Sequence, residues 1–224
     1  MPLILNIDTA VDNALVCLSS DGIPLYAATN AHHMDHASWI HPAIGELMTK
    51  SGKTLQDIDA VAVSNGPGSY TGLRVGLSTA KGLCYGLGKP LISIGTLELM
   101  AHSVDKNLAE YICPVIDARR MEIFTAVYDH NMQEILSPTA VIVDANSFMT
   151  ILEKGRLLFS GNALNKLQRV IVHPNAIFNN FPLTSECFSQ LSAQWFASGK
   201  FADPAYTEPF YIKEFHSTMR KFAR

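Results

Sequence analysis

The same short pattern occurs twice in this sequence, and it constrains the fold more than any other feature. In the first copy an apolar run ends at Ile7-Asp8 and is followed by a β-like run and a turn at Asp21-Gly22. About 109 residues later an apolar run ends at Ile116-Asp117 and is followed by another β-like run and the turn Asp129-His130-Asn131. Self-similarity of this kind indicates an internal duplication. The pattern therefore predicts two similar halves, each opening with a strand, a hairpin and a second strand.

The segments between and after these copies alternate between strand-like and helical patterns. Helices are predicted at residues 37–50, 69–87, 96–104 and 185–198 and after a cap at Asp144, and strands at 60–64, 91–94, 140–143 and 157–160. A chain of 224 residues with 48% hydrophobic composition can bury a core in each of two α/β halves. We therefore expect two lobes, residues 1–104 and 105–224, with the last segment able to pack back on the first lobe.

Charge and composition argue against several classes of protein. The formal net charge is -3 and no run of five like charges occurs, so tight binding to nucleic acid by the chain alone is not expected. No apolar run is long enough for a membrane helix, and the apolar start is too short for a signal peptide. The four cysteines are scattered without zinc spacing, as in proteins of a reducing compartment. These features predict a cytoplasmic protein that does not enter a membrane.

Two strand ends carry the residues that could contact a phosphate. Asp8 and Asp117 each end a buried strand, and an acid in that position either holds a metal-bound water or only caps the strand. Arg119 and Arg120 follow Asp117 and could hold a phosphate or form surface ion pairs. Ser69 begins a helix after a Gly-Pro-Gly turn, where it either caps the helix or contributes to an anion site. Asp8, Ser69, Asp117 and Arg119 are therefore weak candidates for cofactor binding, and no catalytic residue is assigned.

The predicted helix at 69–87 contains four glycines, in two pairs whose members are four residues apart. Gly72 and Gly76 form one pair, and Gly82 and Gly86 form another. Glycine inside a helix costs about 1 kcal/mol relative to alanine, so a close neighbour is expected to offset that cost. We considered two neighbours, the helix at 37–50 of the same chain and a second subunit.

A histidine cluster raises the possibility of a metal site. His32 and His36 have the spacing of two ligands on one helical face, with His33 and His41 nearby. No acidic residue is placed as in a metallopeptidase HExxH motif, and the helix is uncertain at that point. We therefore predict no metal site, and we consider a metallopeptidase a poor hypothesis for the function.

Taken together, these residues resemble the bacterial TsaB (YeaZ) family. The glycine-rich segment Gly66-Pro67-Gly68-Ser69-Tyr70-Thr71-Gly72-Leu73-Arg74-Val75-Gly76 is the most specific part of the resemblance. The other matching pieces are residues 4–9, 80–83, 116–120 with Glu122, and 161–163. The resemblance implies an α/β, two-lobed actin-like ATPase (ASKHA, ribonuclease H-like) fold with duplicated halves.

The resemblance also implies a function and partners. Members of the family are non-catalytic subunits required for threonylcarbamoyl modification of the adenosine next to the anticodon in tRNAs that read codons beginning with A. The chemistry belongs to the related partner TsaD, and the ATPase TsaE joins them. By resemblance, the helices at 37–50 and 69–87 would form the contact with TsaD or with a second copy in a homodimer. The predicted interface residues are Ile40, Ile44, Leu47, Tyr70, Gly72, Leu73, Val75 and Gly76.

Two departures from the family limit what is carried over. Thr9-Ala10-Val11 replaces the usual hydroxyl-rich stretch, so independent ATP hydrolysis is not expected, although ATP or ADP at the interface with TsaD stays open. The histidine pair that binds metal in TsaD is represented only by His102, so that metal site is not transferred. The alternative function is a stand-alone ATPase or small-molecule kinase that uses Asp8, Ser69 and Asp117.

Overall fold

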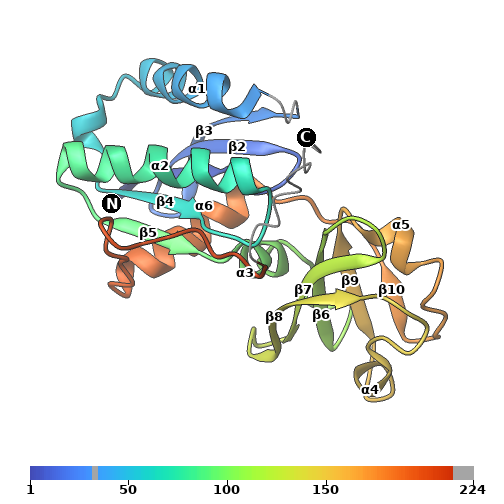
Figure 1. The fold of residues 1–224 in the computed structure, drawn as a ribbon. Helices are drawn as coiled ribbons and strands as arrows, with labels where there is room; N and C mark the ends of the chain where they lie inside the picture. The colour runs from blue at the N-terminus through green and yellow to red at the C-terminus, as the bar shows by residue number, and fades with distance from the viewer. Residues whose placement is uncertain (32–34, 214–224) are drawn as a thin grey trace, which may run out of the picture.

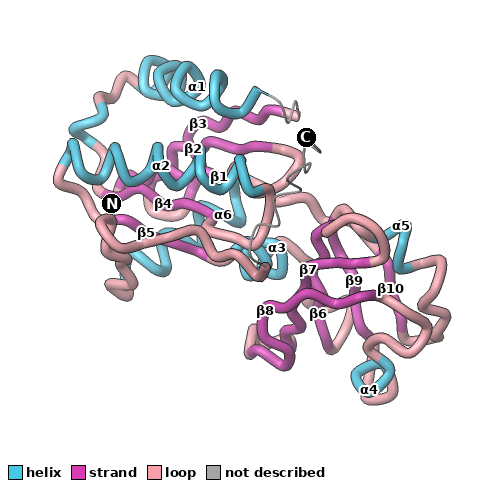
Figure 2. Tube along the Cα trace, viewed as in Figure 1, coloured by secondary structure: helices cyan, strands magenta, loops and turns pink. Residues whose placement is uncertain are grey.

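The computed structural model describes residues 1–31 and 35–213 and contains two five-stranded mixed sheets (Figures 1 and 2). The first sheet has the strand order β3-β2-β1-β4-β5. Its strands are β1 (Leu3–Asp8), β2 (Ala14–Ser20), β3 (Ile23–Asn30), β4 (Ala60–Ser64) and β5 (Leu91–Ile94). In the second sheet the order is β10-β9-β6-β7-β8. Its strands are β6 (Tyr111–Asp117), β7 (Glu122–Asp129), β8 (Glu134–Ile142), β9 (Leu157–Gly161) and β10 (Ala176–Phe178).

The two sheets have the same connectivity. In the first, β1 is antiparallel to β2 and parallel to β4. In the second, β6 is antiparallel to β7 and parallel to β9, so β6 takes the place of β1. This equivalence confirms the predicted two-lobed α/β fold with duplicated halves.

Helices cover both faces of the first sheet. The long helices α1 (His36–Ser51) and α2 (Tyr70–Leu87) pack on the face that carries Leu5 and Ile7. On the opposite face, α6 (Ser185–Ala197) packs against the side chains of Ile4 and Cys17. Helix α3 (Thr96–His102) contacts α6. Thus α6 follows the second sheet in sequence but packs against the first (Figure 1).

The second lobe is smaller, because its helices are short. Its helices α4 (Met149–Leu152) and α5 (Leu164–Leu167) each span a single turn. The first lobe also contains a short 3₁₀ helix, η2 (Leu55–Asp57). None of the helices in the described part of the chain has the length and apolarity that crossing a bilayer needs.

The second half contains most of the differences from the predicted elements. Strand β8 begins at Glu134, six residues before the predicted strand at 140–143. The carboxylate of Asp144 accepts hydrogen bonds from the Asn146 N–H at 3.0 Å and the Ser147 hydroxyl at 2.9 Å. It therefore organises a turn and caps no helix, so the predicted cap is wrong, and the helix that follows, α4, begins only at Met149. Strand β10 and helix α5 were not predicted, because three or four residues are too few to show a periodicity.

Candidate functional site

A cleft of about 710 Å³ lies between the two lobes. The first lobe lines it with Ala10–Asp12 and Gly68–Thr71, and the second with Ile116–Arg119, Phe124 and Asn162. Three of the four weak cofactor candidates, Ser69, Asp117 and Arg119, therefore meet here, together with Tyr70. They come together because β1, α2 and β6 all present their loops at the same edge of the duplicated fold.

Asp8, the fourth candidate, does not line this cleft. Its side chain is fully buried and accepts hydrogen bonds from the Ser64 hydroxyl and from the Ala10 N–H, the latter at 3.0 Å. Burial raises the pKa of Asp8, and these two hydrogen bonds only partly oppose the rise. Asp8 is thus placed to hold the end of β1 and the loop after it, which favours the capping alternative over a ligand contact.

The loop after β1 packs tightly against the start of α2. The Ser69 N–H donates to the Ala10 carbonyl at 2.7 Å, and the Thr9 hydroxyl donates to the Gly72 carbonyl at 2.7 Å. The Ser69 hydroxyl accepts from the Gly72 N–H at 3.2 Å, so Ser69 is the predicted helix cap. These hydrogen bonds hold the loop after β1 directly against the first turn of α2.

The same close packing explains why Gly72 and Gly76 are glycines. A Cβ on Gly72 would lie 2.0 Å from the Thr9 carbonyl oxygen, and a Cβ on Gly76 would lie 2.4 Å from the Thr9 hydroxyl. Their close neighbour is therefore the loop after β1, and the expectation of a second helix at this pair is wrong. In contrast, a Cβ on Gly82 or Gly86 would meet nothing within 4 Å.

Most of the predicted interface residues lie inside the first lobe. Ile40, Ile44, Leu47 and Leu73 belong to the buried residues of the chain, while Tyr70 and Val75 are half-buried. The exposed side of α2 instead carries Ser78, Gly82 and Tyr85. A contact made by α1 and α2 stays a prediction, and these outer positions would have to make it.

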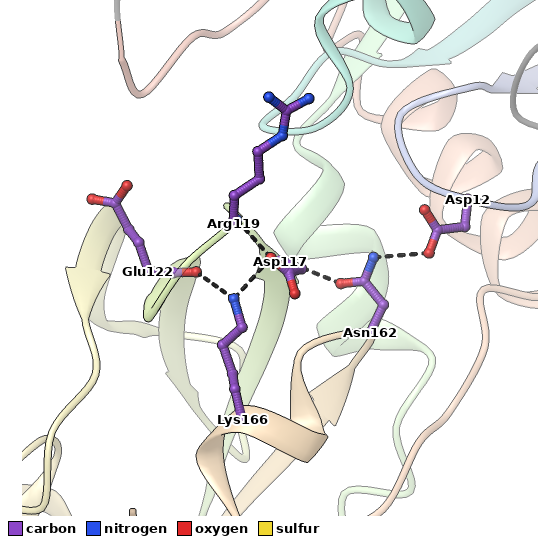
Figure 3. Close-up of polar contacts among 6 residues, drawn as sticks. All are labelled: Asp12, Asp117, Arg119, Glu122, Asn162 and Lys166. Carbon is purple, nitrogen blue, oxygen red and sulfur yellow. Dashed lines mark hydrogen bonds and ion pairs between the residues drawn. The ribbon is translucent and has the colours of Figure 1, made fainter.

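Asp117 is the centre of a polar network on the floor of the cleft (Figure 3). Its N–H donates to the Asn162 side-chain oxygen at 2.8 Å, and the Asn162 amide donates to Asp12 of the first lobe at 3.1 Å. Lys166 donates to the Asp117 carboxylate at 2.8 Å and to the Glu122 carbonyl at 3.0 Å. The network therefore connects the two lobes through side chains.

Electrostatics in this network depends on Lys166. Partial burial acts to raise the pKa of Asp117, but the hydrogen bonds from Lys166 and from the Arg119 N–H outweigh burial and hold the pKa below its usual range. Sequence reasoning missed the roles of Lys166, Asn162 and Asp12. Lys166 lies 49 residues from Asp117, and only the position of Asn162 directly after a strand offered a signal.

Arg119 is held in an unusual backbone conformation beside this network. Its φ is 69° and that of Arg120 is 48°, and the Arg119 N–H donates to the Asp117 carboxylate at 2.6 Å. Figure 3 shows the Arg119 side chain extending from the second lobe toward the ribbon of the first. The cleft therefore combines an exposed guanidinium with the half-buried ring of Tyr70.

The histidine cluster is only partly described. His32 and His33 lie outside the described residues, and His36 is buried on α1. Within residues 1–31 and 35–213, no group of three histidine, cysteine or acidic side chains is arranged to hold a metal ion. His102 is half-buried at the end of α3, and burial lowers its pKa to about 4.

The family model for tRNA N6-adenosine threonylcarbamoyltransferase (TsaD) matches residues 30–198. The tRNA threonylcarbamoyladenosine biosynthesis protein TsaB of Escherichia coli (strain K12) is 39% identical over 133 residues, 57% of this chain and 55% of that protein. The TsaB of Bacillus subtilis (strain 168) is 31% identical over 131 residues, 57% of each chain. The chain thus spans about half the length of these curated relatives.

The solved structure of YeaZ from Pseudomonas aeruginosa has a TM-score of 0.77 and 23% identity, and the match covers 94% of this chain and all of that one. That likeness supports the two-lobed α/β fold with duplicated halves predicted from the sequence. Since the family model matches most of the chain, this chain belongs to the TsaD family, and its similarity to the two TsaB proteins supports the TsaB (YeaZ) group within it.

Proposed function

We propose that this chain acts in tRNA threonylcarbamoyladenosine biosynthesis as a non-catalytic subunit that binds a TsaD transferase. The names of its curated relatives support the pathway, and the match to the TsaD family model supports a related partner. A cytoplasmic setting and participation of TsaE are part of the same proposal.

One structural observation supports the non-catalytic role: one strand-end aspartate is buried, and the other is paired with a lysine. Phosphoryl transfer in a cleft of this kind relies on carboxylates that hold Mg²⁺ directly or through water. Asp8 is buried beneath the loop after β1, and the Lys166 ammonium pairs with Asp117 at 2.8 Å. Asp8 would have to become exposed, and Asp117 would have to lose Lys166, before either could serve a metal-bound nucleotide.

The proposed contact with TsaD uses the exposed side of α2. Ser78, Gly82 and Tyr85 lie there, and the Tyr85 side chain is 90% exposed. Large exposed aromatic side chains are common in protein interfaces. The same surface would serve a homodimer when the partner is absent, and ATP or ADP would bind between this subunit and TsaD rather than to this subunit alone.

The test is co-purification with TsaD, followed by tRNA modification with TsaD and TsaE present. Gly82→Arg adds a long side chain to open surface, so the variant should fold but lose TsaD binding and modification at least tenfold. Val172→Arg, at an 89% exposed position of the second lobe, is the matched control and should behave like the unsubstituted protein. Unchanged binding by Gly82→Arg would overturn the assigned surface.

The alternative is a stand-alone ATPase or small-molecule kinase, and the cleft that contains Ser69, Asp117 and Arg119 is the place where it would act. It requires the purified chain to bind Mg-ATP by itself with micromolar affinity. Titration calorimetry decides between the two: binding and turnover without TsaD would replace the proposed function, and no heat of binding would remove the alternative.

A further inference from the structure

Residues 201–213, here called the strap, run from the end of α6 back along the first lobe and on to the second. Figure 1 draws this segment in red beside β5 and α2. The Ala202 N–H donates to the Leu91 carbonyl at 2.8 Å, and the Lys81 ammonium donates to the Thr207 carbonyl at 2.9 Å. The strap is therefore tied to both β5 and α2.

The strap is anchored most firmly at Phe210. The Phe210 N–H donates to the Asn65 carbonyl at 2.7 Å. Its own carbonyl oxygen lies 2.4 Å from the place where a Cβ on Gly66 would be, so the strap passes where only a glycine leaves room. Because this contact is between backbones, side-chain changes nearby cannot easily release it.

Beyond Phe210 the strap is held by exposed side chains. Tyr211 accepts a hydrogen bond from Arg74 at 3.1 Å, and its ring lies 5.2 Å from that of Tyr70. Lys213 then forms an ion pair with Glu122 on β7 of the second lobe. The Lys213 side chain is 50% exposed, and ion pairs with a solvated partner contribute little, so this end is the weak part of the strap.

Glu122 also belongs to the polar network beneath the cleft. Its carbonyl accepts from Lys166 at 3.0 Å and from the Ala118 N–H at 3.1 Å, and its N–H donates to the Arg119 carbonyl at 3.1 Å. These bonds hold the loop of residues 118–121 between β6 and β7, which carries Arg119. The Lys213–Glu122 ion pair therefore restrains the residue at which this loop ends.

These contacts form a ring around the cleft. One side runs from Asp12 through Asn162, Asp117 and Lys166 to Glu122 (Figure 3). The other side returns from Glu122 through Lys213 and the strap to α2. The residues Phe210–Lys213 also wall a space of about 330 Å³ that Arg119 and Phe124 line from the second lobe.

We propose that the strap is a latch on the cleft: it pivots at Phe210, and release of Lys213 from Glu122 loosens the 118–121 loop and widens the cleft beside α2. A molecule that draws the strap away from α2 would thereby change access to Arg119. The latch follows from the contacts of this chain alone and does not depend on the proposed function.

Amide hydrogen exchange of the full chain tests the latch. Lys213→Ala should speed exchange of the Ala118 and Glu122 amides about two- to fivefold, the factor that corresponds to an exposed ion pair. The charge exchange Lys213→Glu with Glu122→Lys should restore the original rate. Arg156→Ala breaks the Arg156–Glu110 pair, also exposed and also in the second lobe, and should leave residues 118–122 unchanged.

A covalent cross-link supplies the opposite change. Carbodiimide coupling of the paired Lys213 ammonium and Glu122 carboxylate should form an amide bond and slow exchange in residues 118–122 below that of the untreated chain, whereas the same treatment of Lys213→Ala should not. The latch is overturned if the coupled and untreated chains exchange at the same rate.

Discussion

Gly72 on α2 lies directly against Thr9, the first residue after β1. The Cβ of an alanine at position 72 would be 2.0 Å from the Thr9 carbonyl oxygen, and the Thr9 hydroxyl donates to the Gly72 carbonyl at 2.7 Å. The close approach joins two segments 63 residues apart. It gives this glycine a structural task within one chain, independent of any partner.

Gly72→Ala should therefore destabilise the fold, because the added methyl group meets backbone that cannot move without distorting β1. We expect a loss of about 1–3 kcal/mol in the free energy of unfolding, measured by urea denaturation. Gly82→Ala is the matched control on the same helix, where the methyl group meets open space. That variant should gain about 0.5–1 kcal/mol from helix propensity, and a loss equal to that of Gly72→Ala would contradict the assigned contact.

The buried carboxyl of Asp8 should make stability fall as pH rises. Burial raises the pKa of Asp8 in the folded state, so between the ordinary and the raised pKa the folded chain binds more protons than the unfolded chain. Asp8→Asn keeps acceptors for Ser64 and Ala10 but does not titrate. The stability of the variant relative to the unsubstituted chain should increase from about pH 4 upward. A difference that is constant with pH would show that Asp8 keeps an ordinary pKa.

Lys166→Met should weaken the second lobe and change the titration of Asp117. The substitution removes charged hydrogen bonds to Asp117 and to the Glu122 carbonyl, so we expect a loss of about 1–3 kcal/mol. The pKa of Asp117, followed by carboxyl NMR, should rise because burial is then opposed less. Lys50→Met breaks the exposed Lys50–Glu46 pair and should leave both quantities nearly unchanged.

His102 should produce a loss of stability in mild acid. Burial, with a smaller contribution from Lys106, lowers its pKa from 6.5 to about 4. Between these values the unfolded chain binds a proton that the folded chain does not, so stability falls as pH drops from 6.5 to 4. His102→Gln should reduce the change of the free energy of unfolding with pH over that interval, as measured by urea denaturation at several pH values. The exposed His41→Gln variant should retain the full slope.

The repeated strand and hairpin pattern was enough to predict the two halves. The strands ending at Asp8 and Asp117 and the two long helices appear where periodicity placed them, because burial of one face imposes its period on the local sequence. Short elements such as β10 leave no such trace. Ser69 could be predicted as a cap because capping acts over three residues.

The identity of each partner across the fold was decided only by tertiary structure. Sequence alone showed that Asp8 and Asp117 end equivalent strands, but not that one is buried and the other pairs with Lys166. It showed the spacing of Gly72 and Gly76, but not that the loop after β1 fills the space. Periodicity reports which face of an element is buried, whereas the partner of a carboxylate or a glycine depends on segments far away in the chain. Packing of those segments settled these contacts and the path of the strap.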